Sequence, residues 1–400
     1  MKALISSSEA SKLILAEAQA TPSIRCPLNR AAGRILREDI VADRDLPPFD
    51  RAMMDGYAIR TQNAEAKADF VVTGQAFAGS PQITLSEATS SAIEIMTGAP
   101  IPQGADAVIP YEWTKSTSND AFTLTSNEPV SSGLYIHRRA SDYPNGTVLV
   151  KKGTRLGPAE AGIAASCGYA EPIVNQLPRI AILGSGDELV PVETNPEPHQ
   201  IRQSNAFAVE NALANAGYPV GKVAFLSDDE SAARPELEAI IGESDIIIIS
   251  GAVSKGRKDW VPNALNSIAE NRFHGVAQRP GKPLGFWKHK DGSVIFGLPG
   301  NPVSSLVGTH RYILPYLNAI AGKSESTIIQ NVCLAATVQP LPKLTFFLPF
   351  RFNNDGNAIP APVNNSGDYA SLTGTVGFLE IPAGDKTHQP GETFPYYLWT

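Results

Sequence analysis

The amino-acid sequence predicts a multidomain α+β and α/β protein. A central, doubly wound α/β domain is expected between a β-rich N-terminal domain and a small, β-barrel-like C-terminal domain. The chain has 400 residues, which is too many for one ordinary hydrophobic core. From residue 179 to about residue 317, strand-like apolar runs alternate with helix-like segments, which is typical of a mostly parallel sheet with helices on both faces. On either side of this region, short β-like runs are separated by frequent turns.

The predicted domain boundaries follow these changes of pattern. We expect an elongated helical linking domain at 1–45 with 137–177, a β-rich domain at 46–136, the α/β domain at 178–324 and a C-terminal β domain at 325–400.

The first segments predict one helix and one hairpin. Apolar positions behind several serines predict an amphipathic helix over residues 6–20. In LPPFDRAMMDGYAIR, Asp55 and Gly56 predict a turn before a strand, with Met53 and Met54 buried at the base of a hairpin.

The next segments are β-like and then polar. Residues 70–128 consist of short strand-like runs and turns. Residues 136–146, which contain Asp142 beside a basic triplet, are expected to form an exposed charged loop. A helix from Pro158 is expected to end at Gly168.

The α/β domain is organised around DIIIISGAVSKGRKDW, residues 245–260. The consecutive isoleucines at 246–249 predict a strand that is buried on both faces. This strand stops at Ser250 and Gly251, and open α/β sheets bind ligands beyond the carboxyl ends of their strands. The alternative is an ordinary strand-to-helix loop in which Asp259 caps a helix.

Polar residues follow the other predicted strands of this domain as well. They are Asp187 and Glu188 after 180–183, Asp228 and Asp229 after 223–226, Arg279 to Lys282 after a strand near Val276, and Gly300 and Asn301 after 294–296. Because the carboxyl ends of parallel strands share one edge of a sheet, these groups are expected to gather there. Their clustering favours a functional site over an ordinary loop.

The sequence GLPGNP predicts a helix start that suits an anion. Asn301 is a good N-cap and Pro302 a good first helical residue. Gly297 and Gly300 let backbone amides approach a ligand closely, and free amides at a helix start bind anions. The alternative is a well-capped helix without a ligand.

Composition excludes several classes of function. The net charge of −7 argues against a nucleic-acid binder, and the chain has neither an apolar run of membrane-spanning length nor a signal-peptide core. The three cysteines are far apart, and the six histidines never pair at metal spacing. We therefore expect a cytoplasmic protein without zinc.

The residues at the predicted sheet edge point to phosphate chemistry. Their acidic members suit a hard cation such as Mg²⁺, and their basic members and backbone amides suit a phosphate or oxyanion. The acidic group is Asp187, Glu188, Asp228 and Asp259; the other is Lys255, Arg257, Arg279, Lys282 and Gly300. Together they predict a cytosolic α/β enzyme that acts on a phosphorylated ligand, without naming the substrate.

Six motifs, in order along the chain, carry a family resemblance. They are MDGYA (54–58), TGAPIPQGADAVIPYE (97–112), GDEL (186–189), SGAVSKGRKD (250–259), PGKP (280–283) and GLPGNPVS (297–304). With them the sequence resembles the molybdopterin molybdenumtransferase family, the MoeA-type enzymes and the E domain of gephyrin. The resemblance implies an elongated homodimer of four-domain subunits, whose α/β domain binds molybdopterin. It also implies that adenylylated molybdopterin, supplied by a molybdopterin adenylyltransferase, and molybdate are substrates. AMP would be released and molybdenum inserted, with Mg²⁺ assisting.

The resemblance also implies roles for individual residues. Glu188, Asp228 and Asp259 would form the acidic pocket that holds Mg²⁺ near the pterin phosphate. Asp55, from the second subunit, and Asp142, in the position of a Gly-Glu-Asp aspartate, would complete the catalytic set. Substrate would be bound by Ser185, Gly186, Ser250, Gly251, Ser254, Lys255, Arg279, Lys282, Pro299, Gly300, Asn301, Arg351 and Ser371.

Several positions depart from the family pattern. The family has threonine at Ser185, glycine at Ala252, glutamate at Arg257, lysine at Arg279, and glycine and glutamate at Ala140 and Ser141. A planar guanidinium is not a simple replacement for an ammonium group. The carboxylates of the implied pocket are kept, so we expect the chemistry to be retained.

Two other functions remain as alternatives. A non-catalytic pterin-binding or scaffold protein would keep the fold without turnover, and the substitutions at Ala252, Arg257 and Ser141 motivate this alternative. A nucleotide pyrophosphatase of the CinA group would share only the α/β domain, and the MDGYA and TGAP motifs outside that domain count against it.

Overall fold

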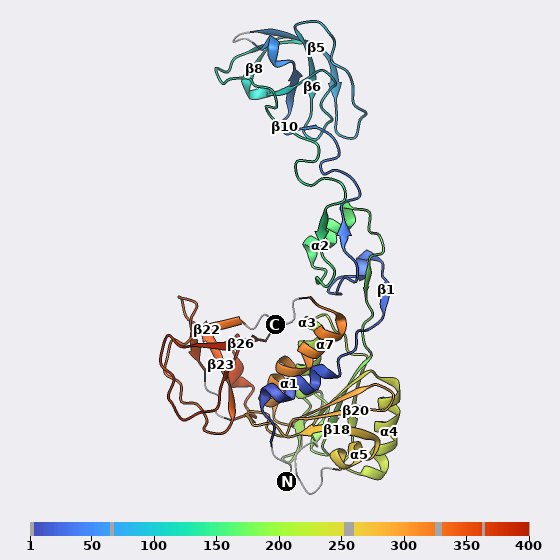
Figure 1. Cartoon of the computed structure of the whole chain (residues 1–400), viewed down its shortest axis with the longest axis vertical. Coiled ribbons are helices and arrows are strands. Elements are labelled where there is room, and N and C mark those ends of the chain that lie inside the picture. Colours follow the sequence, from blue (N-terminus) through green and yellow to red (C-terminus); the bar gives the residue numbers. More distant parts are fainter. Residues whose placement is uncertain (1–3, 65–67, 252–259, 325–329, 362–364, 400) are drawn as a thin grey trace. The chain divides into compact units, whose positions relative to one another are not determined.

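The chain divides into two compact units (Figure 1). The computed structural model describes residues 4–64, 68–251, 260–324, 330–361 and 365–399. Unit 1 comprises Met1–Glu38, Lys152–Ala161 and Glu171–Thr400, and unit 2 comprises Asp39–Lys151 and Gly162–Ala170. The four domain boundaries drawn from the sequence stay a prediction. Among the described residues, no helix combines the length and the apolar character needed to cross a membrane.

Unit 2 contains the expected β-rich fold. Its main sheet has the strand order β7-β4-β6-β5-β9-β8, with β4 Gly56–Ile59, β5 Asp69–Ala76, β6 Ser91–Ile95, β7 Ala107–Pro110, β8 Thr114–Ser118 and β9 Ala121–Leu124. Two short ladders join β3 (Arg51–Ala52) to β10 (Ile136–His137), and β2 (Ile40–Val41) to β11 (Val148–Val150). The 3₁₀ turns are η2 Thr61–Asn63 and η3 Tyr111–Trp113.

The structure accounts for the glycine of the MDGYA motif, but it does not bury both neighbouring methionines. A Cβ on Gly56 would lie 1.9 Å from the Ile109 carbonyl oxygen, so the pairing of β4 with β7 requires glycine. Met53 is 53% exposed, so its predicted burial is wrong. The reason is the two-residue alternation of an extended chain, which turns Ala52 inward and Met53 outward.

The central sheet of unit 1 confirms the predicted α/β domain. The strand order is β16-β13-β17-β21-β20-β18, with β13 Ile180–Ser185, β16 Lys222–Leu226, β17 Ile246–Ser250, β18 Ala269–His274, β20 Gly285–His289 and β21 Val294–Leu298. β16, β13, β17 and β21 are parallel. β20, which the sequence did not predict, is antiparallel to both β21 and β18. β18 therefore runs in the same direction as the parallel strands.

The four isoleucines of β17 explain why this sheet is covered on both sides. Ile246 and Ile248 pack into one core with α1 (Ser7–Ala16), α3 (Asn205–Asn215) and α7 (Leu314–Ala321). Ile247 and Ile249 pack into another with α4 (Glu230–Glu243) and α5 (Val261–Ile268) (Figure 1). All four side chains are at most 1% exposed. The strand is therefore buried on both faces, as predicted.

The helices of unit 1 follow the expected order. They are α1 Ser7–Ala16, α3 Asn205–Asn215, α4 Glu230–Glu243, α5 Val261–Ile268, α6 Pro302–Gly308, a π-helical turn η4 Thr309–Ile313, and α7 Leu314–Ala321. The Ser6 hydroxyl accepts a hydrogen bond from the Glu9 N–H (3.1 Å) and caps α1 as the serines predict. α2 (Pro158–Ser166) is followed by Gly168, which has φ +79°.

The C-terminal β domain belongs to unit 1. Its sheet has the order β19-β23-β25-β26-β22, with β19 Gln278–Arg279, β22 Gln330–Cys333, β23 Thr345–Phe352, β25 Gly377–Ile381 and β26 Thr393–Leu398; β24 Ala358–Pro360 pairs with β23. β19 follows β18 of the central domain, so the two domains share a ladder. The remaining short elements are β1 Ser23–Arg25, β12 Ile173–Asn175, β14 Leu189–Val190, β15 Ile201–Arg202, η1 Leu28–Arg30 and η5 Ala370–Leu372.

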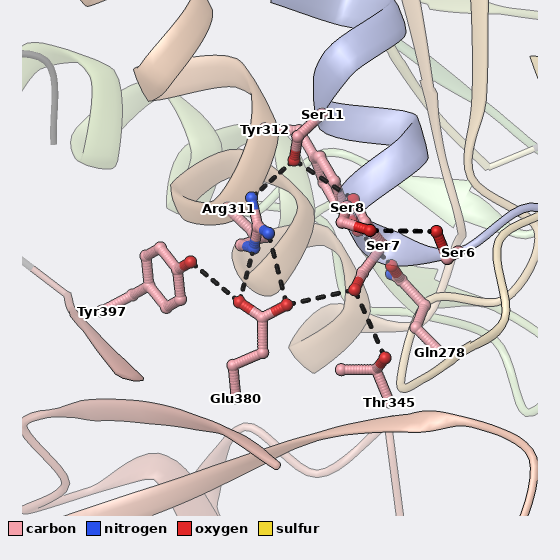
Figure 2. A network of polar contacts seen from close by, with 10 residues as sticks. All are labelled: Ser6, Ser7, Ser8, Ser11, Gln278, Arg311, Tyr312, Thr345, Glu380 and Tyr397. Atoms are coloured by element: carbon pink, nitrogen blue, oxygen red, sulfur yellow. Dashed lines mark hydrogen bonds and ion pairs between the residues drawn. The ribbon is translucent and has the colours of Figure 1, made fainter. Parts of the chain in front are cut away.

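A half-buried polar network fixes the C-terminal β domain against the helices. Figure 2 shows Glu380 of β25 between Arg311 of η4, Tyr397 of β26 and Ser7 of α1. The Glu380 carboxylate accepts hydrogen bonds from Arg311 Nε (2.9 Å), Arg311 Nη2 (3.2 Å), Tyr397 OH (2.8 Å) and Ser7 Oγ (3.1 Å). Three separate parts of unit 1 therefore meet at one carboxylate.

Candidate active site

A cleft of about 540 Å³ lies at the carboxyl edge of the central sheet. Its lining includes eight of the residues predicted from the sequence: Ser185, Glu188, Gly251, Arg279, Lys282, Pro299, Gly300 and Asn301. An adjoining cavity of about 90 Å³ shares Ser185, Glu188, Gly251 and Gly300, and adds Ser250 and Asn205. The structure therefore brings together most of the residues predicted for the α/β domain.

The loop with Arg279 and Lys282 reaches this edge because of the direction of β18. β18 runs parallel to β13, β17 and β21, so the chain that leaves it emerges at the same edge. β20 then returns the chain across the sheet.

The turn after β13 supplies a free hydroxyl and a carboxylate. Ser185 is 4% exposed, and its Oγ is buried without a hydrogen-bond partner among the described residues. A buried hydroxyl without a partner is unfavourable, so this oxygen is available to a ligand. Gly186 has φ +142°, and a Cβ there would lie 2.5 Å from Glu188 Oε2. Glycine thus lets the exposed Glu188 side chain pass close to the backbone.

Asp228 lies beside Asp187 rather than in the lining of either cavity. The Asp228 N–H donates to Asp187 Oδ1 (3.1 Å), and the Asp187 N–H donates to Asp228 Oδ2 (3.4 Å). The two carboxylates therefore join the ends of β16 and β13. A metal-binding role for Asp228 stays a prediction.

The turn after β17 packs against the turn after β13. Gly251 has φ +91°, and a Cβ there would lie 2.5 Å from the Ser185 carbonyl oxygen. Its N–H donates to the Leu298 carbonyl (3.2 Å), so it is already engaged within the protein. Gly251 therefore contributes a close approach of backbones rather than a donor.

The GLPGNP turn is held by the C-terminal β domain. Asn301 occupies the predicted N-cap position, but its side chain makes no capping hydrogen bond. Instead its Nδ2 donates to Ser366 Oγ (2.6 Å), and the Val303 N–H donates to the Ser366 carbonyl (3.0 Å). The prediction of a capping side chain at Asn301 is wrong, because a tertiary partner takes its place.

The PGKP loop is anchored from below by Gln278. This side chain is 1% exposed, and its Nε2 donates to the carbonyls of Pro280 (3.2 Å) and Gly281 (3.3 Å). Its Oε1 accepts from the Tyr312 hydroxyl. Arg279 and Lys282 are exposed on either side of this anchor, so the loop presents two cations to the cleft.

The predicted residues of the C-terminal β domain lie apart from the cleft lining. Arg351 Nη2 donates to the Thr373 carbonyl (3.0 Å), and the Ser371 hydroxyl donates to Asp368. Ser366, which lines the cleft, and Tyr369, which contacts Asn205, were missed by the sequence analysis. No motif singles them out, because their contacts arise from the docking of the β domain.

Asp55 and Asp142 lie in unit 2 and are exposed. Hydrogen bonds to Asp55 Oδ1 from the Thr97 N–H and hydroxyl (both 2.7 Å) hold the pKa of Asp55 below its usual value. Asp142 Oδ1 lies 2.9 Å from His137 Nε2. Ala140 has φ +60°, which accounts for a glycine at this position in the family pattern. Ser141 is exposed in the same loop.

Replacing Thr97 with valine is expected to raise the pKa of Asp55 toward its ordinary value. The variant removes the hydroxyl donor, and a carboxylate with fewer donors is easier to protonate. A depressed native pKa stabilises the fold above the unfolded pKa, and this contribution is lost as pH falls through the native pKa. NMR titration of the carboxyl measures the shift, with Thr97→Ser as the control that keeps the hydroxyl. An unchanged pKa in Thr97→Val would contradict the assignment.

Part of the predicted site falls outside the described residues. Ser254, Lys255 and Asp259, together with Ala252 and Arg257, lie within 252–259. Over the ranges that the structure does describe, no three or more His, Cys, Asp or Glu side chains gather as metal ligands.

Two family models match this chain. Residues 5–168 match a family model described as the MoeA N-terminal region (domain I and II), and residues 181–319 match one described as a probable molybdopterin binding domain. The match at 5–168 lies outside the α/β domain and so agrees with the interpretation of the MDGYA and TGAP motifs.

The chain is also similar to whole proteins over most of its length. The chain is 37% identical over 374 residues to the molybdopterin molybdenumtransferase of Synechocystis sp., covering 92% of this chain and 93% of that protein. It is 35% identical over 298 residues to the enzyme of the same name from Haemophilus influenzae, covering 74% and 73%. The crystal structure of the molybdopterin biosynthesis MoeA protein from Pyrococcus horikoshii OT3 has a TM-score of 0.79 and 28% identity, covering 99% and 100% of the two chains. The chain therefore belongs to the molybdopterin molybdenumtransferase family, a family of transferases.

Proposed function

We propose that this protein inserts molybdenum from molybdate into adenylylated molybdopterin, with release of AMP and with Mg²⁺ assisting. Family membership supports the general part, a role in molybdenum cofactor biosynthesis. The observation that carries the specific part is the cleft itself, where two exposed cations, a free buried hydroxyl and a carboxylate face one cavity. Such a mixture suits a phosphate ester, an oxyanion and a hard cation in one site.

Several residues of the cleft have a defined task in this proposal. Lys282 and Arg279 would bind the phosphate and molybdate oxygens, and the Ser185 hydroxyl would donate a hydrogen bond to the ligand. Gly300 would let these oxygens approach the backbone closely, and Gly251 would keep the turns after β13 and β17 together beside it. Binding both substrates on one rigid sheet edge lowers the barrier by orientation.

Mg²⁺ would be held by Glu188, Asp228 and Asp259. The described donors fit this ion, because Mg²⁺ prefers carboxylate oxygens and is usually bound by one or two carboxylates together with substrate phosphates. The ion would neutralise charge on the phosphate that bridges pterin and adenosine.

The remaining predicted residues and partners enter as part of the same proposal. The protein would act as a cytoplasmic homodimer in which Asp55 of one subunit serves the cleft of the other, and Asp142 would complete the catalytic set. Arg351 and Ser371 would contact substrate from the C-terminal β domain. A molybdopterin adenylyltransferase would supply the adenylylated substrate.

An AMP-release assay tests the proposal directly. Purified protein with adenylylated molybdopterin, molybdate and Mg²⁺ is expected to release AMP and yield active cofactor. Chelation by EDTA should slow the release about 10-fold or more, and added Mg²⁺ should restore it. A verified family enzyme serves as the control. If that enzyme works while this protein releases no AMP, the proposal is wrong, and tight pterin binding without release would favour the scaffold alternative.

A further inference from the structure

Asn205, the first residue of α3, uses its side-chain amide to link three parts of the cleft wall. Its Nδ2 donates to Ser250 Oγ (3.0 Å) and to the Gly300 carbonyl (2.7 Å), and its Oδ1 accepts from the Tyr369 hydroxyl (3.2 Å). Ser250 ends β17, Gly300 follows β21, and Tyr369 belongs to the C-terminal β domain. One short side chain therefore joins two adjacent turns and the domain that packs on them.

The direction of these hydrogen bonds is fixed by carbonyl groups, which can only accept. The Gly300 carbonyl requires the NH₂ group of Asn205 on its side, which leaves Oδ1 for Tyr369. Ser305 Oγ donates to the Pro299 carbonyl (2.7 Å), so the hydrogen between Ser305 and Ser250 (3.3 Å) comes from Ser250.

The two serines of the cleft therefore differ in what they can offer a ligand. The Ser250 hydroxyl accepts from Asn205 and donates to Ser305, so both its functions are used inside the protein. The Ser185 hydroxyl has no partner among the described residues. Ser250 thus stabilises the cleft wall, whereas the Ser185 hydroxyl is available to a ligand.

We infer that Asn205 is a positioning residue that sets the separation between the turns after β17 and β21, and that Tyr369 holds Asn205 in place. The inference rests on the proposed function for its activity measurements. Burial raises the pKa of Tyr369, so the hydroxyl remains a donor at neutral pH. The adjacent Asn301–Ser366 hydrogen bond ties the same turn to the same loop of the β domain.

A double-mutant cycle on AMP release tests the inference. Asn205→Ala is expected to lower kcat/KM about 100-fold, because it lets the two turns move apart. Tyr369→Phe removes one hydroxyl and is expected to lower kcat/KM about 10-fold. The double variant should match Asn205→Ala alone, since Tyr369 acts through Asn205. Fully additive losses, or a wild-type rate in Asn205→Ala, would overturn the inference.

A second measurement separates this inference from the proposed function. Hydrogen exchange of peptides covering 246–251 and 298–305 should be faster in Asn205→Ala and, to a smaller extent, in Tyr369→Phe. Asn211→Ala is the matched control, because the one partner of this exposed α3 side chain among the described residues is the Phe207 carbonyl of its own helix (2.7 Å). If the wild type releases no AMP, the proposed function fails, but the role of Asn205 is still tested by hydrogen exchange. Exchange in Asn205→Ala that equals that of the wild type would overturn this role. If Asn205→Ala does not fold, Tyr369→Phe decides by the same exchange measurement.

Discussion

Replacing Glu380 with alanine is expected to lower the free energy of unfolding by about 3–5 kcal/mol, because it removes one partner of a largely buried ion pair. Arg311 and Glu380 are 12% and 16% exposed. The carboxylate also accepts from Tyr397 and Ser7, so four hydrogen bonds are lost together. The guanidinium would keep the Ser11 hydroxyl (2.6 Å) as its one described hydrogen-bond partner.

Calorimetric unfolding at neutral pH measures this loss. The double variant Arg311→Met/Glu380→Leu is expected to lose less, because it leaves neither charge buried. Glu238→Ala is the surface control: it removes an exposed partner of Arg234 (3.0 Å) and should cost at most about 1 kcal/mol. Equal losses for Glu380→Ala and Glu238→Ala would show that the network of Figure 2 does not anchor the β domain.

Replacing Gly251 with alanine is expected to lower kcat/KM for AMP release about 100-fold. It should also destabilise the protein by about 1–3 kcal/mol. The backbone at Gly251 has φ +91°, and the new Cβ would lie 2.5 Å from the Ser185 carbonyl oxygen. Backbone cannot yield as a flexible side chain can, so the turns after β13 and β17 must separate. The Ser185 hydroxyl would then move within the cleft.

Gly242→Ala is the matched control for this variant. Gly242 lies in α4, its φ is not positive, and a Cβ there meets nothing within 4 Å. The control should stabilise the protein by about 0.5–1 kcal/mol, since alanine is the better helix former. Steady-state kinetics and calorimetry on both variants give the comparison. A Gly251→Ala protein with wild-type kcat/KM would remove this turn from the proposed site.

The parallel core of the central domain could be predicted because its signal is local. A run such as Ile246–Ile249 identifies a strand buried on both faces, and polar residues directly after each strand must share an edge once the strands are parallel. β20 could not be predicted in this way. Its sequence, GFWKH, is short and of mixed character, and its reversed direction depends on β18 and β21.

The hydrogen-bond partners of polar side chains could not be predicted from the sequence either. Asn301 is a residue type that favours the N-cap position, yet its side-chain amide donates a hydrogen bond to Ser366. Asn205 and Tyr369 meet although 164 residues separate them in the chain, and nothing in either local sequence announces the contact. Such contacts are decided by how whole domains dock, which a local pattern does not contain. Gly56 and Gly251 differ from these residues, because the sequence already marks both positions and the structure leaves no room there for a Cβ.

The short ladder between β2 and β11 has a consequence for how this protein can change over evolutionary time. Val41 pairs directly with Val148, so the chain leaves and re-enters this ladder at neighbouring points. The closure entropy of a long excursion grows only slowly with its length. Insertions and deletions between these two residues can therefore accumulate at little thermodynamic cost to the sheet that carries the cleft. The loops of that excursion can therefore vary in length, whereas the segments that carry Asp55 and Asp142 are constrained by the proposed function.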